Sequence, residues 1–289
     1  MLGSFKKAIF RVLCLGCVLI GGLMAKPNPE ELFNLGEDIL NFALNGGGGT
    51  FSIESLEAKE YYIQAKEYFE KACELNYAKG CVSLGSLYEG EGLVIGEKNP
   101  RLKERLKKAV QYYSKACDLK DGEGCFMLGY KYEFGNEVVK KDLKKAIQYY
   151  VKACELDNDG GCLIFLTRDK LVNKQELFQY LSKACGLNSG SGCYVLGIYH
   201  GSKDFKKAAQ YYSKACDLNY KFGCSTLGAM QYQGKVVVKN EKQAMKNFEK
   251  ACKLGYGEAC EIFSLEVLCK LSDLKACTMS YDKKKALGF

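Results

Sequence analysis

The chain has 289 residues, and its 42 Lys and Arg against 34 Asp and Glu give a formal net charge of +8 at pH 7. This excess of positive charge is spread along the sequence, without the basic stripe or reading motif that marks a nucleic-acid-binding protein. The single histidine, His200, is too few for a histidine-based zinc centre. We therefore expect no nucleic-acid partner, no metal and no other cofactor.

The N-terminus has the order of a secretory signal peptide. Three basic residues, the last of them Arg11, precede an apolar run over residues 12–23, and the small Ala25 follows. We predict a signal peptide over residues 1–25, cleaved after Ala25, and a secreted or periplasmic protein. No later apolar stretch approaches the length of a membrane span, so the mature chain is not expected to cross a membrane.

Beyond this segment, every cysteine belongs to a pair separated by seven residues. Two cysteines eight positions apart on one helix would lie roughly 12 Å apart, too far for a disulfide, whereas a tight helical hairpin brings them face to face. Sequence alone does not generally fix disulfide connectivity, but only pairing within each gap repeats with the chain. We therefore predict seven disulfides, one within each pair. Disulfides persist outside the reducing cytosol. The pairs are Cys73/Cys81, Cys117/Cys125, Cys154/Cys162, Cys185/Cys193, Cys216/Cys224, Cys252/Cys260 and Cys269/Cys277.

One predicted helix ends at the first cysteine of each pair. Lys-Ala-Cys occurs six times there, at intervals of 44, 37, 31, 31 and 36 residues, which is the period of helical solenoids. Apolar residues recur eight, five, four and one positions before the cysteine, as at Ala146, Tyr149, Tyr150 and Ala153. This spacing marks one face of an amphipathic helix. Residues suited to its N-cap are Asp142, Asp204 and Asn240.

A second predicted helix begins near the second cysteine, after a short polar turn that contains glycine, such as residues 120–124. Its signature, Gly-Cys-x-x-Leu-Gly, begins at Gly80, Gly124, Gly192 and Gly223. Glycine inside a helix costs about 1 kcal/mol relative to alanine. We therefore expect these glycines to let two helices approach closely.

The predicted bridges would also supply much of the stability of such an array. Each short loop contributes about 2.5 kcal/mol when the unfolded chain is restricted by the bridge. Seven of them could hold a thin solenoid together without a deep core.

The predicted array is not uniform at its start. Residues 32–44 are expected to form a first helix without a cysteine. The four glycines at 46–49 form a linker, and a second insertion covers about residues 97–105.

The array also varies towards its end. The unit that begins at Cys162 has Leu166 where glycine stands elsewhere. The last pair lacks Lys-Ala before Cys269, so it is taken as a terminal cap. We expect about six repeats and this cap over residues 26–277, followed by a tail over 278–289.

The combined pattern Gly-Cys-x-x-Leu-Gly-x-x-Tyr and Ala-x-x-Tyr-Tyr-x-Lys-Ala-Cys resembles the Sel1-like repeat, a relative of the tetratricopeptide repeat. The seven-residue cysteine spacing resembles the secreted Helicobacter cysteine-rich protein family. The resemblance covers nearly all of residues 30–277. It implies an all-α, right-handed solenoid of αα-hairpins with one disulfide per repeat. It further implies export, binding roles at the cell wall or towards the host, and penicillin binding with weak β-lactamase activity.

The residues themselves give little support to hydrolysis. A serine β-lactamase needs a serine with a lysine one helical turn later, together with Ser-Asp-Asn and Lys-Thr-Gly elements. A Ser-x-x-Lys runs from Ser272 to Lys275 in the predicted cap, and neither companion element occurs. His200 replaces a tyrosine on a helix face, which favours a packing role. No catalytic residue is assigned.

Candidate binding residues lie on the second helix of each hairpin. Its packed stripe is predicted to hold the cysteine and the positions three, four and seven later, so the positions two, five and nine later face the other way. An apolar face of this kind suits an extended peptide or glycan, with ordinary packing between neighbouring repeats as the favoured alternative. These residues are Met127, Tyr130, Phe134, Val195, Ile198, Thr226, Ala229 and Gln233.

Together these patterns favour a secreted, monomeric scaffold that binds a peptide, a protein or a peptidoglycan-derived ligand, with host proteins among its partners. The alternative from another class is a weak β-lactamase or penicillin-binding protein. A purely structural spacer is the third possibility.

Overall fold

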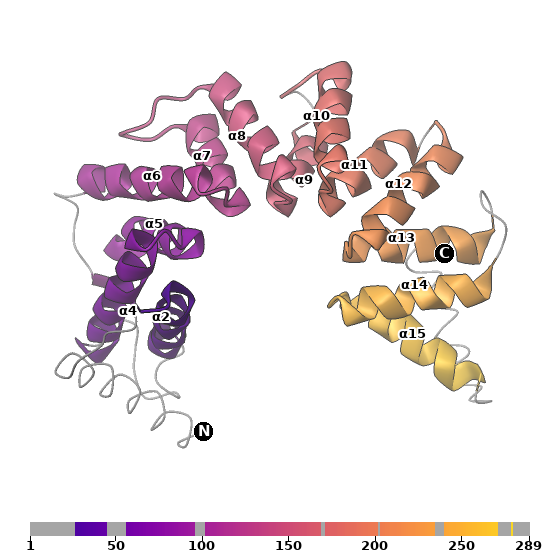
Figure 1. The fold of residues 1–289 in the computed structure, drawn as a ribbon, viewed down its shortest axis with the longest axis horizontal. Helices are drawn as coiled ribbons and strands as arrows, with labels where there is room; N and C mark the ends of the chain where they lie inside the picture. Colours follow the sequence, from indigo (N-terminus) through magenta and orange to yellow (C-terminus); the bar gives the residue numbers. More distant parts are fainter. Residues whose placement is uncertain are drawn as a thin grey trace. The chain divides into compact units, whose positions relative to one another are not determined.

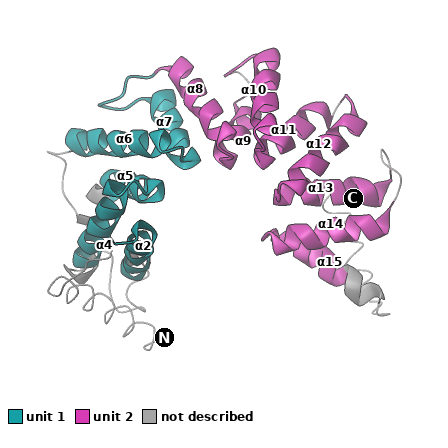
Figure 2. Cartoon of the chain, in the orientation of Figure 1, with its two compact units in different colours: residues 1–141 teal, residues 142–289 magenta. Residues whose placement is uncertain are grey.

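The computed structural model describes residues 27–44, 56–95, 102–168, 171–201, 203–234 and 240–270, together with Met279. Over these ranges the chain forms thirteen helices and no strand, which confirms the all-α prediction. No helix in them is long and apolar enough to cross a membrane. The chain divides into two compact units, residues 1–141 and 142–289 (Figure 2). The predicted signal peptide, glycine linker and C-terminal tail lie outside the described residues, apart from Met279.

Unit 1 packs each helix against the next one along the chain (Figure 1). Its first helix begins earlier than predicted, because Asn28 caps it by accepting the Glu30 backbone N–H at 3.0 Å and Pro29 fits the first helical position. The second insertion is partly helical, since residues 102–105 form the first turn of α6. The helices are α2 (Pro29–Leu44), α4 (Leu56–Glu74), α5 (Ala78–Ile95), α6 (Leu102–Asp118) and α7 (Gly122–Phe134).

Unit 2 contains the other eight described helices. The predicted N-caps are confirmed, because Asp142, Asp204 and Asn240 each accept a backbone N–H of the first turn at 3.0 Å. The helices are α8 (Leu143–Glu155), α9 (Asp159–Thr167), α10 (Lys174–Gly186), α11 (Gly190–Gly201), α12 (Phe205–Asp217), α13 (Lys221–Gln233), α14 (Glu241–Lys253) and α15 (Gly257–Lys270).

The turns between the two cysteines of each pair differ from the prediction in one respect. The residue that reverses the chain has a positive φ, and in five of six turns it is not glycine. Its N–H bonds back to the cysteine carbonyl, and the next N–H bonds to the preceding alanine carbonyl, as with Asn76 to Cys73 and Tyr77 to Ala72. This is the hydrogen-bond pattern of a Schellman motif. The six residues are Asn76, Lys120, Asp157, Asn188, Asn219 and Gly255.

The glycines of the signature serve close packing, as predicted. A Cβ on Gly124 would lie 2.6 Å from the Ala116 Cβ across the turn. A Cβ on Gly85 would lie 2.7 Å from a ring carbon of Tyr113, which is fully buried. Gly36, Gly197 and Gly228 likewise receive an aromatic ring from the following helix. Each of these helix crossings therefore buries one large ring against a stretch of backbone that has no side chain.

We expect Gly85→Ala to destabilise unit 1 by about 1–3 kcal/mol, because the new methyl group overlaps the Tyr113 ring in a packed core. Gly90→Ala is the matched control in the same helix, since a Cβ there meets nothing within 4 Å. It should be neutral or stabilising, by up to about 1 kcal/mol. Urea unfolding of both variants measures the difference, and equal midpoints would contradict this account of the glycine.

The repeat that begins at Cys162 and departs from the sequence pattern also differs in structure. Helix α9 has 9 residues, the shortest of the described helices, and Leu166 near its end is exposed. Leu166 occupies the position at which the other repeats have the glycine that allows a close helix crossing. Helix α9 instead packs against α8 and α11. The contact with α11 is made partly through polar groups.

Candidate functional site

Six of the seven cysteine pairs form disulfides, one at the turn of each of six helix pairs. Their Cα–Cα distances are 4.4–4.7 Å, within the range that a disulfide accepts. Five are buried, and Cys252–Cys260 is half-buried. The seventh pair includes Cys277, which lies outside the described residues.

Burial makes the disulfides part of the core. The second cysteine of each buried bridge opens a helix on its packed stripe, where the neighbouring helices cover it. Its sulfur therefore packs as a small hydrophobic group as well as closing the turn. No solvent reaches these residues, so they offer neither a reactive thiol nor a binding surface. The second cysteines that are 0% exposed are Cys81, Cys125, Cys162, Cys193 and Cys224.

In unit 2 the four disulfide turns, which join α8 to α9, α10 to α11, α12 to α13 and α14 to α15, lie along one edge (Figure 1). We call this the turn edge. Each turn places the residues just after the first cysteine, and those that open the next helix, on the same edge. The side chains of this edge therefore come from successive repeats.

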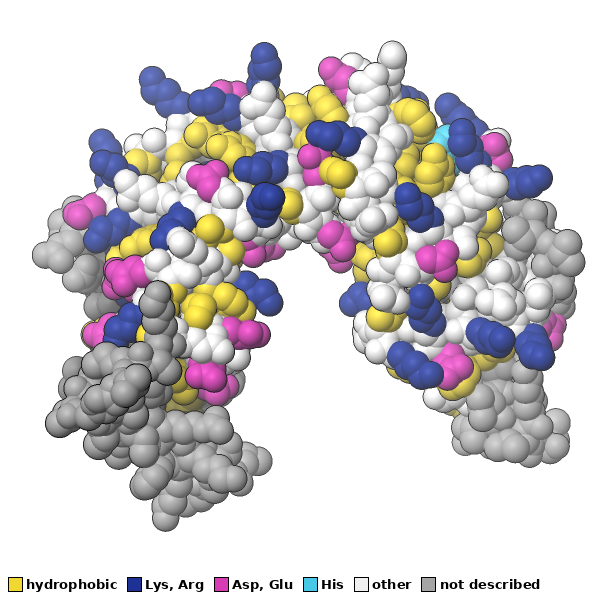
Figure 3. Space-filling view, in the orientation of Figure 1, with side chains coloured by type: hydrophobic (Ala, Val, Ile, Leu, Met, Phe, Trp, Pro, Cys, Tyr) yellow, Lys and Arg dark blue, Asp and Glu magenta, His cyan; other side chains and the backbone are white. Residues whose placement is uncertain are grey.

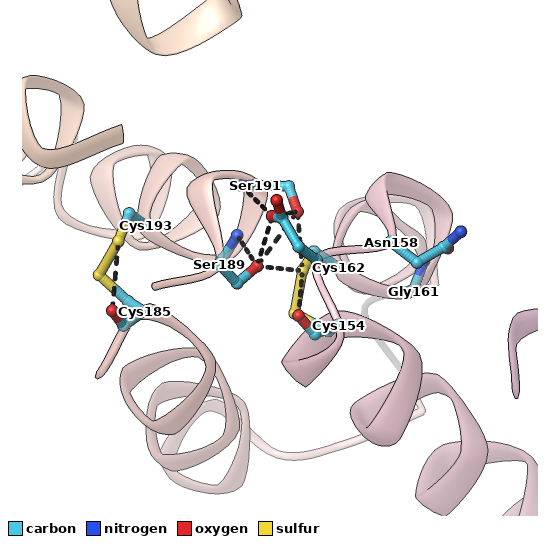
Figure 4. Close-up of a disulfide and its surroundings, with 10 residues drawn as sticks. Cys154, Asn158, Gly161, Cys162, Cys185, Ser189, Ser191 and Cys193 are labelled. Atoms are coloured by element: carbon cyan, nitrogen blue, oxygen red, sulfur yellow. Dashed lines mark hydrogen bonds between the residues drawn. A yellow bond between two sulfur atoms is a disulfide. The ribbon is translucent and has the colours of Figure 1, made fainter. Parts of the chain in front are cut away.

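A polar cluster joins two of these turns. Asp157 Oδ1 accepts the Ser189 hydroxyl at 3.1 Å and lies 3.5 Å from both the N–H and the hydroxyl of Ser191. The Ser191 hydroxyl also lies 3.3 Å from Cys162 Sγ, and Ser189 Oγ caps α11 by accepting the Gly192 N–H at 3.0 Å. Figure 4 shows both serines beside the Cys154–Cys162 bridge. Both serines are buried and hydrogen-bonded, as buried polar groups must be to avoid a desolvation cost.

Aromatic rings continue from this cluster along the turn edge. Tyr194 of α11 lies 5.3 Å from Tyr220, Tyr220 lies 5.5 Å from Phe222, and Phe222 lies 5.2 Å from Tyr256, all between ring centroids. These separations suit direct ring contact. Tyr194, Phe222 and Tyr256 are half-buried, whereas Tyr220 is buried. We call these four residues the aromatic ladder.

Two carboxylates lie where the ladder meets the polar cluster. Burial raises the pKa of Tyr220, and the charges of Asp159, Tyr194 and Asp157 raise it further. Partial loss of hydration also raises the pKa of Asp159, as does the Asp157 charge, while the Ser191 hydrogen bond and the Lys221 charge lower it. Tyr220, Asp157 and Asp159 are therefore close enough to act on one another, and the two acids remain exposed.

Two lysines of the Lys-Ala-Cys motif have a role that was not predicted from the sequence. The Lys115 ammonium donates to the Cys73 carbonyl oxygen at 2.6 Å, and the Lys250 ammonium donates to that of Cys216 at 2.6 Å. Each bond links the end of one cysteine-terminated helix to the corresponding helix of the preceding repeat. A cation is favourable there, because helix C-termini carry partial negative charge. The only sequence signal was the recurrence of the lysine itself.

Lys250→Met should therefore destabilise unit 2 by about 1–2 kcal/mol, since it removes a charge-assisted hydrogen bond and leaves the Cys216 carbonyl oxygen without it. Lys253→Met is the control, because its ammonium pairs with the Glu249 carboxylate on an exposed part of the same helix. Its effect should stay within about 0.5 kcal/mol. Denaturant unfolding distinguishes the two, and equal losses would show that the repeated lysine has no special role.

The predicted binding residues do not form one surface. Met127, Tyr130 and Phe134 follow one face of α7, where the last two are exposed and their ring centroids are 4.6 Å apart. Ile198 is partly buried and packs against the cluster that contains Tyr212. Thr226 is also partly buried.

Val195, which was predicted to face away from the packed stripe, is part of the core, as the packing alternative expects. Its side chain is fully buried in a core cluster with Leu181 and Leu196. The second helix of a hairpin packs against helices on both of its sides. The face opposite its packed stripe is therefore also covered, unlike that of a helix with one buried side.

The described residues do not bear equally on metal and serine chemistry. They contain no cluster of three or more His, Cys, Asp or Glu side chains that could hold a metal ion. His200 packs among aromatic rings and lies 5.4 Å from Tyr211 in a stacked arrangement, in keeping with the packing role. The chain has two Ser-x-x-Lys stretches near its C-terminus, Ser272–Lys275 and Ser280–Lys283, and both lie outside these ranges.

The architecture defines a class of protein: an array of αα-hairpins in which a disulfide closes the turn within each hairpin. The model of the Sel1 repeat matches residues 57–77, 78–121, 122–158, 190–220 and 223–256, and so passes over the divergent α9 and α10. The chain belongs to the Sel1 repeat family.

Two curated relatives come from Helicobacter pylori. "Beta-lactamase HcpA" of strain J99 is 46% identical over 97 residues, which are 34% of this chain and 32% of the relative. "Putative beta-lactamase HcpC" of strain 26695 is 44% identical over 94 residues, which are 32% of this chain and 27% of the relative. The matches thus span about a third of the length of these relatives, or less.

Two solved structures are also similar to the chain. Helicobacter pylori cysteine-rich protein B is 62% identical, covering 44% of this chain and 99% of that one with a TM-score of 0.40. A Sel1 repeat protein from Oxalobacter formigenes is 20% identical, covering 87% of this chain and 99% of that one with a TM-score of 0.51, and shows the shared fold. The six disulfides and the Helicobacter relatives together indicate a protein located outside the cytoplasm.

Proposed function

We propose that the protein is an exported scaffold that binds a partner protein or peptide along the turn edge of unit 2. The aromatic ladder carries this proposal, because it offers half-buried rings from three successive repeats. Aromatic side chains are enriched in protein interfaces, where they contribute large contact areas at low entropic cost. A row of rings at repeat spacing suits an extended chain better than a compact small molecule.

The electrostatic surface supports a local interface rather than a general polyanion-binding one. On the face seen in Figure 3, basic side chains are interspersed with acidic and apolar ones. Binding would then depend on the particular side chains of the turn edge. Proteins of the envelope or the host, and peptides derived from peptidoglycan, are the partner classes in keeping with an exported protein.

The test is capture of partners by the oxidised full chain from envelope and host extracts, followed by direct binding of each purified partner. Phe222→Ala should weaken binding, because it removes the middle ring of the ladder. Phe205→Ala, an exposed residue of the same unit, should leave binding unchanged. A partner that binds both variants equally well, or a failure to capture any, would contradict a role for the ladder.

Export itself is part of the proposal. We propose that the signal peptide is removed after Ala25, releasing the chain to the periplasm or the medium. N-terminal sequencing of the protein recovered from these fractions tests it. An N-terminus at Lys26 is expected, and recovery of the uncleaved chain would contradict it.

Weak β-lactam hydrolysis is the second candidate, favoured by the names of the two curated relatives. Incubation with a fluorescent penicillin and a chromogenic cephalosporin tests it. A covalent adduct with turnover that persists through repeated purification would establish the enzyme. Absence of both would contradict this candidate.

A further inference from the structure

One member of the aromatic ladder has an unsatisfied polar group. Tyr220 is 8% exposed, and its hydroxyl is buried without a hydrogen-bond partner. An unpaired buried hydroxyl costs roughly 1–3 kcal/mol. The ring is fixed by contacts with Tyr194 and Phe222, and it packs over Gly190, where a Cβ would lie 2.9 Å from the Tyr220 Cβ.

The charged groups around this hydroxyl are predominantly negative. Gly190, over which Tyr220 packs, lies between Ser189 and Ser191, the two serines that bond to Asp157. Asp157 precedes α9 and Asp159 lies in its first turn, and both charges act on Tyr220. The three hydrogen bonds to Asp157 all use Oδ1, so Oδ2 accepts none from the described residues. A group with several N–H donors and a positive charge could bond to both carboxylates and to the Tyr220 oxygen.

The chain itself places an ammonium group beside this site. Lys221 Nζ lies 5.3 Å from the centroid of the Phe222 ring, a separation at which a cation is attracted to the face of the ring. The Lys221 charge also lowers the pKa of Asp159, so it acts on the same carboxylate. Lys221 is only half-buried and forms no ion pair with either acid in the part of the chain that the structure describes. Its ammonium is thus a competitor for the site rather than a fixed part of it.

We propose that the turn edge binds the ammonium group of a lysine side chain on a partner peptide. Asp157, Asp159 and the Tyr220 hydroxyl receive the ammonium group, and the methylene stem lies along the rings of the aromatic ladder. This rests on the proposed function, because it names the residue that the ladder recognises. The compact ammonium, with three donors, matches the three oxygen acceptors.

The test uses two synthetic libraries of acetylated, amidated pentapeptides with random flanking residues. One carries lysine at the centre, and the other carries Nε-acetyl-lysine, which keeps the stem but has no charge. The oxidised full chain should bind the lysine library about tenfold more tightly, since one charge-assisted contact is lost on acetylation. Binding of both libraries with equal affinity would overturn the proposal.

Three variants make the test specific. Asp159→Asn should reduce the preference for lysine to about twofold or less, whereas Asp217→Asn, an exposed acid in the same unit, should keep it. Lys221→Met should strengthen lysine binding, because it removes the competing ammonium. A preference that survives Asp159→Asn, or falls with Lys221→Met, would contradict this assignment.

Phe222→Ala distinguishes failure of lysine recognition from failure of the proposed peptide binding by the aromatic ladder. If that variant loses both libraries while the unmodified chain binds them equally, the ladder binds peptides without recognising lysine. If Phe222→Ala changes nothing, the ladder is not the binding surface, and both proposals fail.

Discussion

Reduction of the disulfides should unfold the protein at room temperature. Each bridge closes a short loop and contributes about 2.5 kcal/mol by restricting the unfolded chain. Six such bridges sum to roughly 15 kcal/mol, which equals the upper end of the usual stability of a folded domain. Circular dichroism in the presence and absence of a phosphine reductant measures the effect. Retention of the full helical signal after complete reduction would contradict it.

Removing a single bridge gives a graded version of this experiment. Cys185→Ala with Cys193→Ala should lower the melting temperature by about 5–10 °C, from the same loop contribution. Because repeats contact mainly their neighbours, the loss should concentrate in α10 and α11. Hydrogen exchange of these two helices tests the location, and uniform loss of protection across unit 2 would contradict it.

Phe248→Ala should destabilise unit 2 by about 3–5 kcal/mol. The Phe248 side chain is fully buried and packs over Gly228, so truncation leaves a cavity that the surrounding helices cannot readily fill. Phe205→Ala, in the corresponding helix of the preceding repeat, is the matched control because its ring is largely exposed. It should cost less than about 1 kcal/mol. Similar losses in urea unfolding would show that burial at this position does not govern stability.

The cysteine-terminated helices were predictable because one physical pattern specifies each of them. Ala146, Tyr150 and Ala153 fall at helical spacing and are fully buried, and Asp142 caps the helix at its predicted position. The close approach at Gly85 was also predictable, since glycine inside a helix needs compensation. Local periodicity and local hydrogen bonding sufficed for these features.

The remaining features depend on contacts between repeats, which a single amphipathic pattern does not contain. Val195 lies on the second face of its helix, and only the position of the neighbouring hairpin decides that this face is covered. The Tyr220 site likewise combines residues from three turns. Polar residues were expected to accompany glycine at the turns, whereas Lys120 and Asp157 themselves adopt the positive φ. In each of these turns two backbone hydrogen bonds hold the reversal, as between Asn76 and Cys73 and between Tyr77 and Ala72.

The depth at which the disulfides lie was missed for the same reason. The pairing of Cys81, Cys125 and Cys224 with their partners follows from the spacing within one hairpin. Their complete burial depends instead on helices that lie outside that hairpin's own pattern, which cover the turn from the neighbouring repeats. Spacing therefore predicted which cysteines pair, but not that the sulfur atoms would belong to the core.

Each disulfide closes across a sequence separation of 8, at the turn between the two helices of one hairpin. Under mechanical tension, force would pass through the sulfur atoms and bypass the enclosed backbone. In a stretching experiment, the residues enclosed by each oxidised turn would therefore not extend, and a reductant would release them. Such a chain would resist being threaded from either end by an unfolding motor, because each oxidised turn presents a closed loop instead of a single strand.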